Sequence, residues 1–191
     1  MNIIVKKLNK ENVDILKEYL EKAYIKKYGD KNSKASFFNI NYLDEYYVNQ
    51  KDCYFALIEN NNELKSFCIY SPISHKQIKL DVKYELDNYE DKEIELIYSY
   101  ISDIDLNLSN IYINLIESFE NGYGRKLVSY LKDNYSKIML YSDSDACEFW
   151  DKMQFFNVFG YTYIYPPKAI KELQWNQESV KDVVWIPGIK F

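Results

Sequence analysis

One stretch of the sequence constrains the fold more than any other, because it switches from strand to helix and back to strand. An apolar strand is predicted from Ile111 to Ser118, and Gly122 and Gly124 follow it. A helix is then predicted from Gly124 to about Tyr135, and a second strand from Lys137 to Ser142. A strand, a helix and a strand in succession require a crossover connection, which is typical of α/β folds.

The rest of the chain is predicted to add hairpins to this crossover. Asn12 is expected to cap a helix whose apolar residues recur at helical spacing: Val13, Leu16, Leu20, Ala23 and Tyr24. The other predicted elements are strands at 3–8, 53–59, 64–70, 77–86, 94–100, 157–165 and 183–191 and short helices at 37–50 and 145–153. No linker separates them, so we expect a single domain over 1–191. Its fold class is α/β (α+β), a mixed, mostly antiparallel sheet flanked by helices.

Composition narrows the classes of partner. The 191 residues are 47% hydrophobic, which is enough for a sizeable core, and the formal net charge of −5 argues against a nucleic-acid partner. The three cysteines lie far apart with no histidine cluster beside them, so neither a disulfide framework nor a metal site is expected. No window approaches the roughly 20 apolar residues of a membrane span, and no signal peptide is recognised. We therefore expect a cytoplasmic protein without a membrane or a metal partner.

The glycine turn is the clearest candidate for a binding site. Gly122 and Gly124 precede Arg125, which is the only arginine of the chain, and Lys126. The first amides of a helix lack partners within the helix and attract anions, whereas exposed cations there are unfavourable by roughly 0.3 to 1 kcal/mol each. A P-loop is excluded because the spacing G-x-x-x-x-G-K-[ST] is not present, and a Rossmann fingerprint is excluded because position 127 is a leucine where a glycine is required. A glycine bulge turn with solvated cations remains the alternative to an anion site.

Two motifs in this order resemble the GNAT superfamily of acyl-CoA N-acyltransferases. The family pattern Q/R-x-x-G-x-G/A is matched by residues 119–124, with Phe119 at the Gln/Arg position. A downstream pattern resembling "FYEKLGF" is matched by "FWDKMQF", residues 149–155, in which Trp150 takes the place of the tyrosine and Gln154 that of the glycine. The resemblance covers about 55 residues well, and the N-terminal strand, helix and hairpin fit more loosely. It implies a cofactor-binding core at 111–165 and an elongated insertion at about 71–110.

This resemblance implies a V-shaped splay between the fourth and fifth core strands, which would accept the pantetheine arm of acetyl-CoA or another acyl-CoA. The backbone near Ile116 would pair with pantetheine like an added strand, and the amides of residues 121–126 would hold the pyrophosphate. Arg125 and Lys126 would add charge-assisted hydrogen bonds to phosphate. The cofactor-binding residues implied in this way are Ile116, Ser118, Asn121, Gly122, Tyr123, Gly124, Arg125, Lys126, Asp143 and Trp150.

The implied reaction is direct transfer of an acyl group to a primary amine of a small molecule or peptide. Glu117 is the candidate general base because it stands near the end of the fourth strand, and a solvated or lysine-paired Glu117 is the alternative. Trp150 stands where the family has a tyrosine as the general acid, and an indole cannot deliver a proton. Either another tyrosine, namely Tyr141, Tyr161 or Tyr163, is the general acid, or the thiolate leaves without one. A catalytically weak acyl-CoA-binding or regulatory protein is the second hypothesis, and an interaction protein that kept the fold is the third.

Features outside these motifs add little to the functional prediction. The acidic stretch between Glu85 and Asp105 is interpreted as a solvated face, although it would also attract a cationic acceptor. His75 is the only histidine and is expected to be solvated. Trp175 and Trp185 are predicted to cover either the acceptor site or a dimer interface, so both a monomer and a homodimer are consistent with the sequence.

Overall fold

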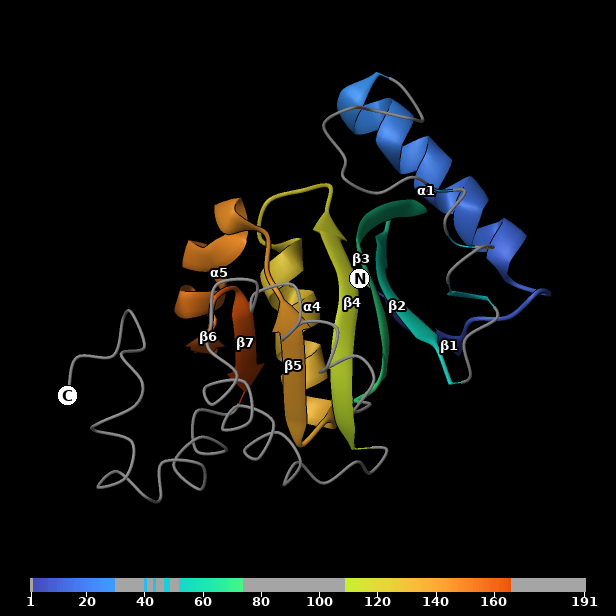
Figure 1. The fold of residues 1–191 in the computed structure, drawn as a ribbon. Helices are drawn as coiled ribbons and strands as arrows, with labels where there is room; N and C mark the ends of the chain where they lie inside the picture. Colours follow the sequence, from blue (N-terminus) through green and yellow to red (C-terminus); the bar gives the residue numbers. More distant parts are fainter. Residues whose placement is uncertain are drawn as a thin grey trace, which may run out of the picture. The chain divides into compact units, whose positions relative to one another are not determined.

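The computed structural model of the chain describes residues 2–29, 40, 43, 47–48, 52–73 and 109–165. Within this part the elements are β1 Asn2–Lys7, α1 Val13–Tyr28, β2 Tyr54–Asn60, β3 Glu63–Pro72, β4 Asn110–Ser118, α4 Tyr123–Asn134, β5 Lys137–Tyr141, η3 Ser144–Ala146, α5 Cys147–Lys152, β6 Phe156–Phe159 and β7 Thr162–Tyr165 (Figure 1). Several predicted features lie largely or wholly outside the described residues. They are the strands at 77–86, 94–100 and 183–191, the helix at 37–50, the acidic stretch, His75, Trp175 and Trp185.

The seven described strands form one mixed sheet, in the order β1-β2-β3-β4-β5-β7-β6. β1, β2 and β3 pair antiparallel, as do β5, β7 and β6, whereas β4 and β5 run parallel. The helix between β4 and β5 is the crossover that the sequence predicts. The α/β class and the mixed, mostly antiparallel sheet with flanking helices are therefore confirmed.

The chain divides into two compact units. The first unit comprises Met1–Ser71 and Ile113–Tyr130, and the second comprises Pro72–Tyr112 and Leu131–Phe191. β4 and α4 therefore contribute residues to both units.

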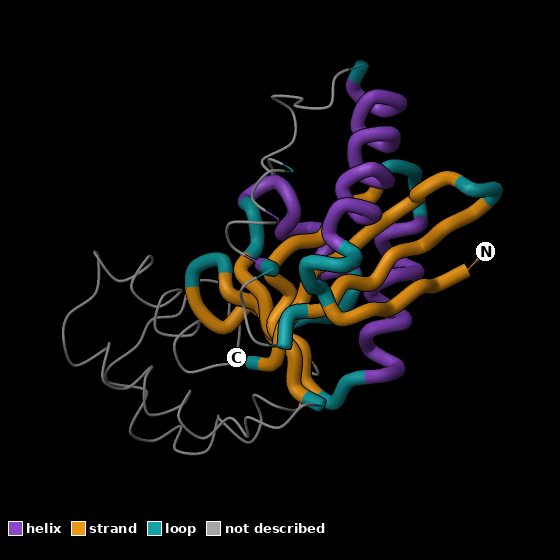
Figure 2. The backbone as a smooth tube through the Cα atoms, turned by 90° about the vertical axis from the view of Figure 1, so that its right-hand side faces the viewer, coloured by secondary structure: helices purple, strands orange, loops and turns teal. Residues whose placement is uncertain are grey.

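The core of the first unit lies between α1 and the β2–β3 hairpin. All five α1 residues predicted from helical spacing are buried: Val13, Leu16, Leu20, Ala23 and Tyr24. They pack against apolar residues of the two strands, including Phe55, Leu57 and Phe67. Figure 2 shows β1, β2 and β3 running side by side, with the turn between β2 and β3 at their end. Asn61 and Asn62 take the left-handed backbone conformation (φ 55° and 59°) that such a tight turn requires.

Helix α1 begins and ends close to the predicted positions, but Asn12 does not cap it with its side chain. The Asn12 amide group instead donates to Lys7 O (2.7 Å) and accepts from the Asn9 amide (3.0 Å), so it holds the preceding loop. At the other end Gly29 lies in the left-handed region (φ 79°), and its amide donates to Ile25 O at 2.9 Å.

In the second unit the single strand predicted at 157–165 is wrong, because this segment contributes to two strands. β6 and β7 form an antiparallel hairpin around Gly160, whose φ of 47° lies in the left-handed region. Asn157 Nδ2 closes the turn by donating to Gly160 O at 2.6 Å. Apolar and aromatic residues lie on both sides of Gly160, so the sequence shows no polar interruption where the chain reverses.

Candidate functional site

The turn between β4 and α4 owes its shape to Gly122. This residue has φ 85°, and a Cβ added to it would meet no atom within 4 Å. The glycine is therefore required for its backbone conformation and not for lack of space.

The backbone amides of this turn divide into two groups. Three of them already donate within the turn: Tyr123 N to Glu120 O (3.3 Å), Gly124 N to Ser118 Oγ (3.1 Å) and Lys126 N to Gly122 O (3.2 Å). Those of Asn121, Gly122 and Arg125 donate to no residue in the part of the chain that the structure describes. The second group is thus able to bind an acceptor from outside the turn.

Ser118, predicted as a cofactor residue, has a capping role in the turn. Its hydroxyl donates to Glu120 O at 2.7 Å and accepts the Gly124 amide. It supplies the oxygen that a helix-capping serine provides, although it lies several residues before α4 begins. Ile116, two residues earlier, is half-buried on β4.

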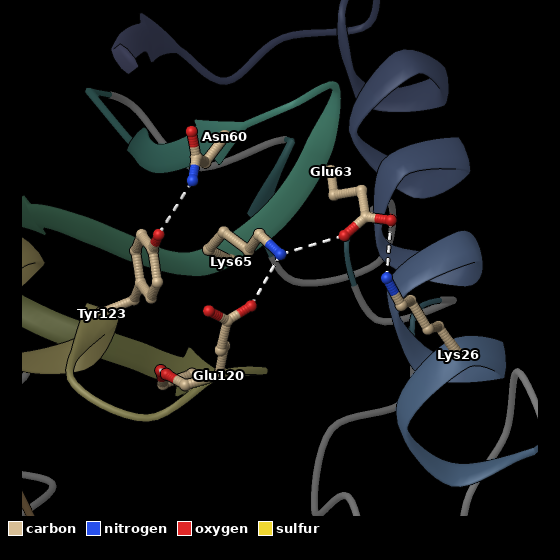
Figure 3. Close-up of polar contacts among 7 residues, drawn as sticks. Lys26, Asn60, Glu63, Lys65, Glu120 and Tyr123 are labelled. Carbon is tan, nitrogen blue, oxygen red and sulfur yellow. Dashed lines mark hydrogen bonds and ion pairs between the residues drawn. The ribbon is translucent and has the colours of Figure 1, made fainter. Parts of the chain in front are cut away.

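The two cations of the turn differ in their surroundings. Lys126 Nζ lies 4.3 Å from the ring centroid of Tyr123, on its own helix. Tyr123 in turn accepts a hydrogen bond from Asn60 Nδ2 at 3.0 Å (Figure 3). Arg125 is exposed and makes no hydrogen bond or ion pair with any described residue. The only arginine of the chain is therefore available to an external anion beside the three available amides.

An ion-pair network fixes the start of the turn to β3 and α1. Lys65 Nζ lies 2.6 Å from Glu120 Oε2 and 2.9 Å from Glu63 Oε2, and Lys26 Nζ lies 2.5 Å from Glu63 Oε1 (Figure 3). The hydrogen bonds from Lys26 and Lys65 lower the pKa of Glu63 to about 2. The Phe119 amide donates to Lys65 O at 2.9 Å. These contacts place Glu120, and with it the turn, at a fixed position on the first unit.

Glu117, the predicted general base, is held by two tyrosines of α1. Tyr24 donates its hydroxyl to Glu117 Oε2, and Tyr28 donates to Glu117 Oε1 at 2.8 Å. Burial, then the hydrogen bond to Glu117, then the charge of that carboxylate raise the pKa of Tyr28 to about 12. The Ser66 hydroxyl donates to the Glu117 carbonyl at 2.8 Å. Glu117 is half-buried, and both of its carboxylate oxygens accept from tyrosine hydroxyls.

Phe119 stands where the family pattern has Gln or Arg, and it packs into the core of the first unit. Its ring lies edge-on to Tyr24 (centroids 5.2 Å apart) and stacks on Phe67 (6.0 Å, interplanar angle 13°). The side chain therefore serves packing at the point where the turn leaves β4.

Asp143 and Trp150 belong to the second unit. Trp150 is 3% exposed, and its ring lies 4.9 Å from that of Phe149 and 5.0 Å from that of Phe155. Asp143 is exposed and precedes the short helix η3, where its carbonyl accepts the Ala146 amide at 3.0 Å. The cofactor roles of both residues stay predictions.

The tyrosines considered as general acids also lie in the second unit, and they differ in exposure. Tyr163 is buried, and this burial, with a hydrogen bond to Cys147 as the next cause, raises its pKa to about 12. Tyr141 and Tyr161 are 41% and 40% exposed, and their rings meet edge-on at 6.1 Å. Of the three phenols, only Tyr163 is shielded from solvent.

Sequence reasoning missed the contribution of α1 to this site. Tyr24 and Tyr28 are four residues apart and so share a helix face, which the spacing reveals, but nothing in the spacing identifies Glu117 as their partner. Lys27, between them, donates to Ser118 O at 2.6 Å and was not predicted at all.

Two kinds of feature are absent from the described residues. None of their helices is long and apolar enough to cross a membrane. No three of their His, Cys, Asp and Glu side chains are grouped so that they could hold a metal ion.

Comparisons with known proteins gave matches among solved structures only. No model of a protein family matches the chain, and neither does any curated protein. The Bacillus subtilis N-acetyltransferase YlbP in complex with coenzyme A is 17% identical, with 87% of this chain and 98% of that chain covered and a TM-score of 0.46. The PaiA N-acetyltransferase from Thermoplasma acidophilum, also in complex with coenzyme A, is 13% identical over 86% and 97% of the two chains, with a TM-score of 0.41. The aminoglycoside acetyltransferase AAC(6')-Ib with coenzyme A is 12% identical over 91% and 99%, with a TM-score of 0.44.

Proposed function

We propose that this chain is an N-acyltransferase that moves an acetyl or related acyl group from acyl-CoA to a primary amine. The observation that carries the proposal is the glycine turn. The amides of Asn121, Gly122 and Arg125 and the guanidinium of Arg125 have no acceptor among the described residues. A diphosphate has the charge and the acceptor oxygens to satisfy them together.

The proposed transfer forms a bond between the amine nitrogen and the acyl carbon and breaks the bond between that carbon and the sulfur of coenzyme A. Glu117 takes the proton that the ammonium loses before the neutral amine attacks, directly or through one water. The second proton, which the nitrogen loses as the amide forms, goes to the departing thiolate or to solvent. Its two oxygens are fixed by the hydroxyls of Tyr24 and Tyr28, which keeps the carboxylate at a fixed place at the end of β4. A backbone amide of β4 polarises the thioester carbonyl, and the departing thiolate takes a proton from solvent or leaves as the anion.

A second candidate, an acyl-CoA-binding protein with little transfer activity, is favoured by one observation. Trp150 stands at the position where the family pattern has a tyrosine, and its indole is packed among aromatic rings. The indole N–H donates a hydrogen bond but cannot deliver a proton. This candidate keeps the acyl-CoA site and gives up efficient turnover.

Isothermal calorimetry with acetyl-CoA tests the binding step. Arg125→Ala should weaken acetyl-CoA binding about tenfold, because it removes one charge-assisted hydrogen bond at an exposed position. Lys22→Ala is a matched control, since Lys22 is an exposed lysine of α1 that pairs with Glu18. Dephospho-CoA identifies which phosphates the arginine contacts. Equal acetyl-CoA affinities of the original protein and Arg125→Ala would show that Arg125 is not part of the site. If the folded protein does not bind acetyl-CoA even at high micromolar concentration, both acyl-CoA hypotheses are refuted and the interaction protein is favoured.

Release of coenzyme A thiol in the presence of a panel of primary amines tests the transfer step. Glu117→Gln keeps the size of the side chain and should reduce turnover by roughly 10²-fold to 10⁴-fold, the usual contribution of a general base. Acetyl-CoA binding combined with background thiol release across the whole panel would favour the acyl-CoA-binding protein.

A further inference from the structure

The ammonium of Lys27 lies against the end of β4. Its Nζ donates to Ser118 O at 2.6 Å, and it lies 4.9 Å from the ring centroid of Tyr28 and 5.6 Å from that of Phe119. No ion pair joins Lys27 to a carboxylate of the described residues. The charge is therefore held by a carbonyl oxygen and two aromatic rings, although Lys27 as a whole is an exposed residue.

Its neighbour in the sequence behaves differently. Lys26 makes an ordinary exposed ion pair with Glu63 at 2.5 Å (Figure 3). An exposed lysine loses side-chain conformational entropy when its head group is fixed, so the contacts of Lys27 must offset that loss. Two ring faces and a carbonyl provide such contacts for an ammonium: the rings attract the positive charge, and the carbonyl accepts one of its three N–H groups.

The same groups adjoin the proposed general base. Ser118 follows Glu117 directly on β4, and the Tyr28 ring beside Lys27 carries the hydroxyl that donates to Glu117 Oε1. The Lys27 head group and the Glu117 carboxylate therefore share Tyr28 as a neighbour.

We propose that the Ser118 carbonyl and the rings of Tyr28 and Phe119 form a binding site for a primary alkyl ammonium, and that Lys27 occupies this site until an acceptor amine displaces it. The proposal rests on the proposed function for the identity of the acceptor, but the binding site itself does not depend on acyl-CoA. It assigns the acceptor to the class of amines carried on an unbranched alkyl chain, as in a lysine side chain. A quaternary ammonium fits less well, because it has no N–H for Ser118 O.

The test is chemical complementation of Lys27→Ala by n-butylammonium, which has the shape of the missing side chain. Binding is followed by the NMR shifts of the Ser118 and Phe119 amides in the full chain. We expect n-butylammonium to bind Lys27→Ala about tenfold more tightly than the original protein, because the tethered competitor is gone. Lys26→Ala is the matched control and should bind it like the original protein. Tetramethylammonium at equal ionic strength should bind Lys27→Ala more weakly than n-butylammonium, and 1-butanol should not compete.

Equal n-butylammonium affinities in Lys27→Ala, Lys26→Ala and the original protein would overturn the proposal, as would equal binding of n-butylammonium and tetramethylammonium. Circular dichroism establishes that Lys27→Ala is folded, and Lys27→Ser is used in its place if it is not. The titrations contain no acyl-CoA, so the two proposals fail separately. If n-butylammonium complements Lys27→Ala but the protein does not bind acetyl-CoA, the ammonium site is supported and the acyltransferase function is refuted. If the protein acetylates amines but n-butylammonium does not complement Lys27→Ala, the acyltransferase function is supported and the ammonium site is refuted.

Discussion

The hydrogen bond between Tyr28 and Glu117 should be measurable through the titration of the tyrosine. Burial is the largest cause of the raised pKa of Tyr28, and the hydrogen bond to Glu117 and the charge of that carboxylate follow. Glu117→Gln removes the charge but leaves an amide oxygen that can accept from the phenol. The pKa of Tyr28 should therefore fall from about 12 only part of the way toward its ordinary value of 10.0.

The sign of the effect on stability follows from the direction of the shift. Because the phenol of Tyr28 keeps its proton more firmly in the folded state, its contribution to stability is fully present below about pH 10 and is lost as the pH rises toward about 12. A difference of two pKa units corresponds to at most about 2.7 kcal/mol, and screening by solvent at a half-buried phenol reduces this to about 1 to 2 kcal/mol. The free energy of unfolding should thus fall less steeply over this interval in Tyr28→Phe.

Two measurements check this reasoning. The near-ultraviolet absorption of phenolate, compared between each protein and its Tyr28→Phe counterpart, isolates the titration of Tyr28 among 20 tyrosines. Urea unfolding at pH values from 9 to 11.5 gives the loss of stability. Glu120→Gln is the control, since Glu120 contacts Lys65 and should leave Tyr28 unchanged. An unaltered Tyr28 titration in Glu117→Gln would refute the hydrogen bond, and a complete return to 10.0 would refute burial as the main cause.

Three further substitutions test the packing and the turns by urea unfolding at neutral pH. Leu127→Ala should lower the free energy of unfolding by about 2 to 5 kcal/mol, because the side chain is 0% exposed; a loss below about 1 kcal/mol would contradict its place in the core. Gly122→Ala should cost about 1 to 2 kcal/mol through its φ of 85° alone, since no atom lies near the added Cβ, and an unchanged stability would contradict that conformation. Gln154→Gly should have the opposite effect and raise the free energy of unfolding by about 0.5 kcal/mol. The φ of 60° strains the backbone of Gln154, and a glycine relieves this strain but loses more conformational entropy on folding, which offsets part of the gain. A lower free energy of unfolding would contradict strain at this position.

Local patterns in the sequence predicted the elements whose residues interact along the chain. Helical spacing identified every buried residue of α1, and the apolar runs at 53–59 and 64–70 predicted the two strands of the β2–β3 hairpin. Both signals depend on neighbours a few residues apart, and the sequence displays these directly. The prediction of one strand at 157–165 was wrong for the same reason, since apolar and aromatic residues continue on both sides of Gly160 and only the backbone conformation there reverses the chain.

The contacts of the candidate site were beyond such patterns because they join distant parts of the chain. Tyr24 and Tyr28 reach Glu117 across 93 and 89 residues, and Lys65 reaches Glu120 across 55. Periodicity predicts which face of a helix is apolar, but not which strand residue that face will meet. The glycine turn could be located from the sequence, whereas the division of its amides into bonded and available groups depends on the position of the Ser118 hydroxyl.

Phe119 illustrates how a departure from a family pattern can gain a physical role. Judged by the pattern alone, a phenylalanine at the Gln/Arg position is a departure that counts against the site. In the structure the ring packs on Tyr24 and Phe67, and its amide is bonded to Lys65 O, so the residue anchors the end of β4 to the core. The centroid of the same ring lies 5.6 Å from the Lys27 ammonium. A glutamine at this position would offer the ammonium no aromatic face, and an arginine would repel its charge. Phe119→Gln should therefore weaken n-butylammonium binding in the Lys27→Ala background. If the affinity is unchanged in a folded Phe119→Gln protein, Phe119 supports the strand end alone and takes no part in the ammonium site.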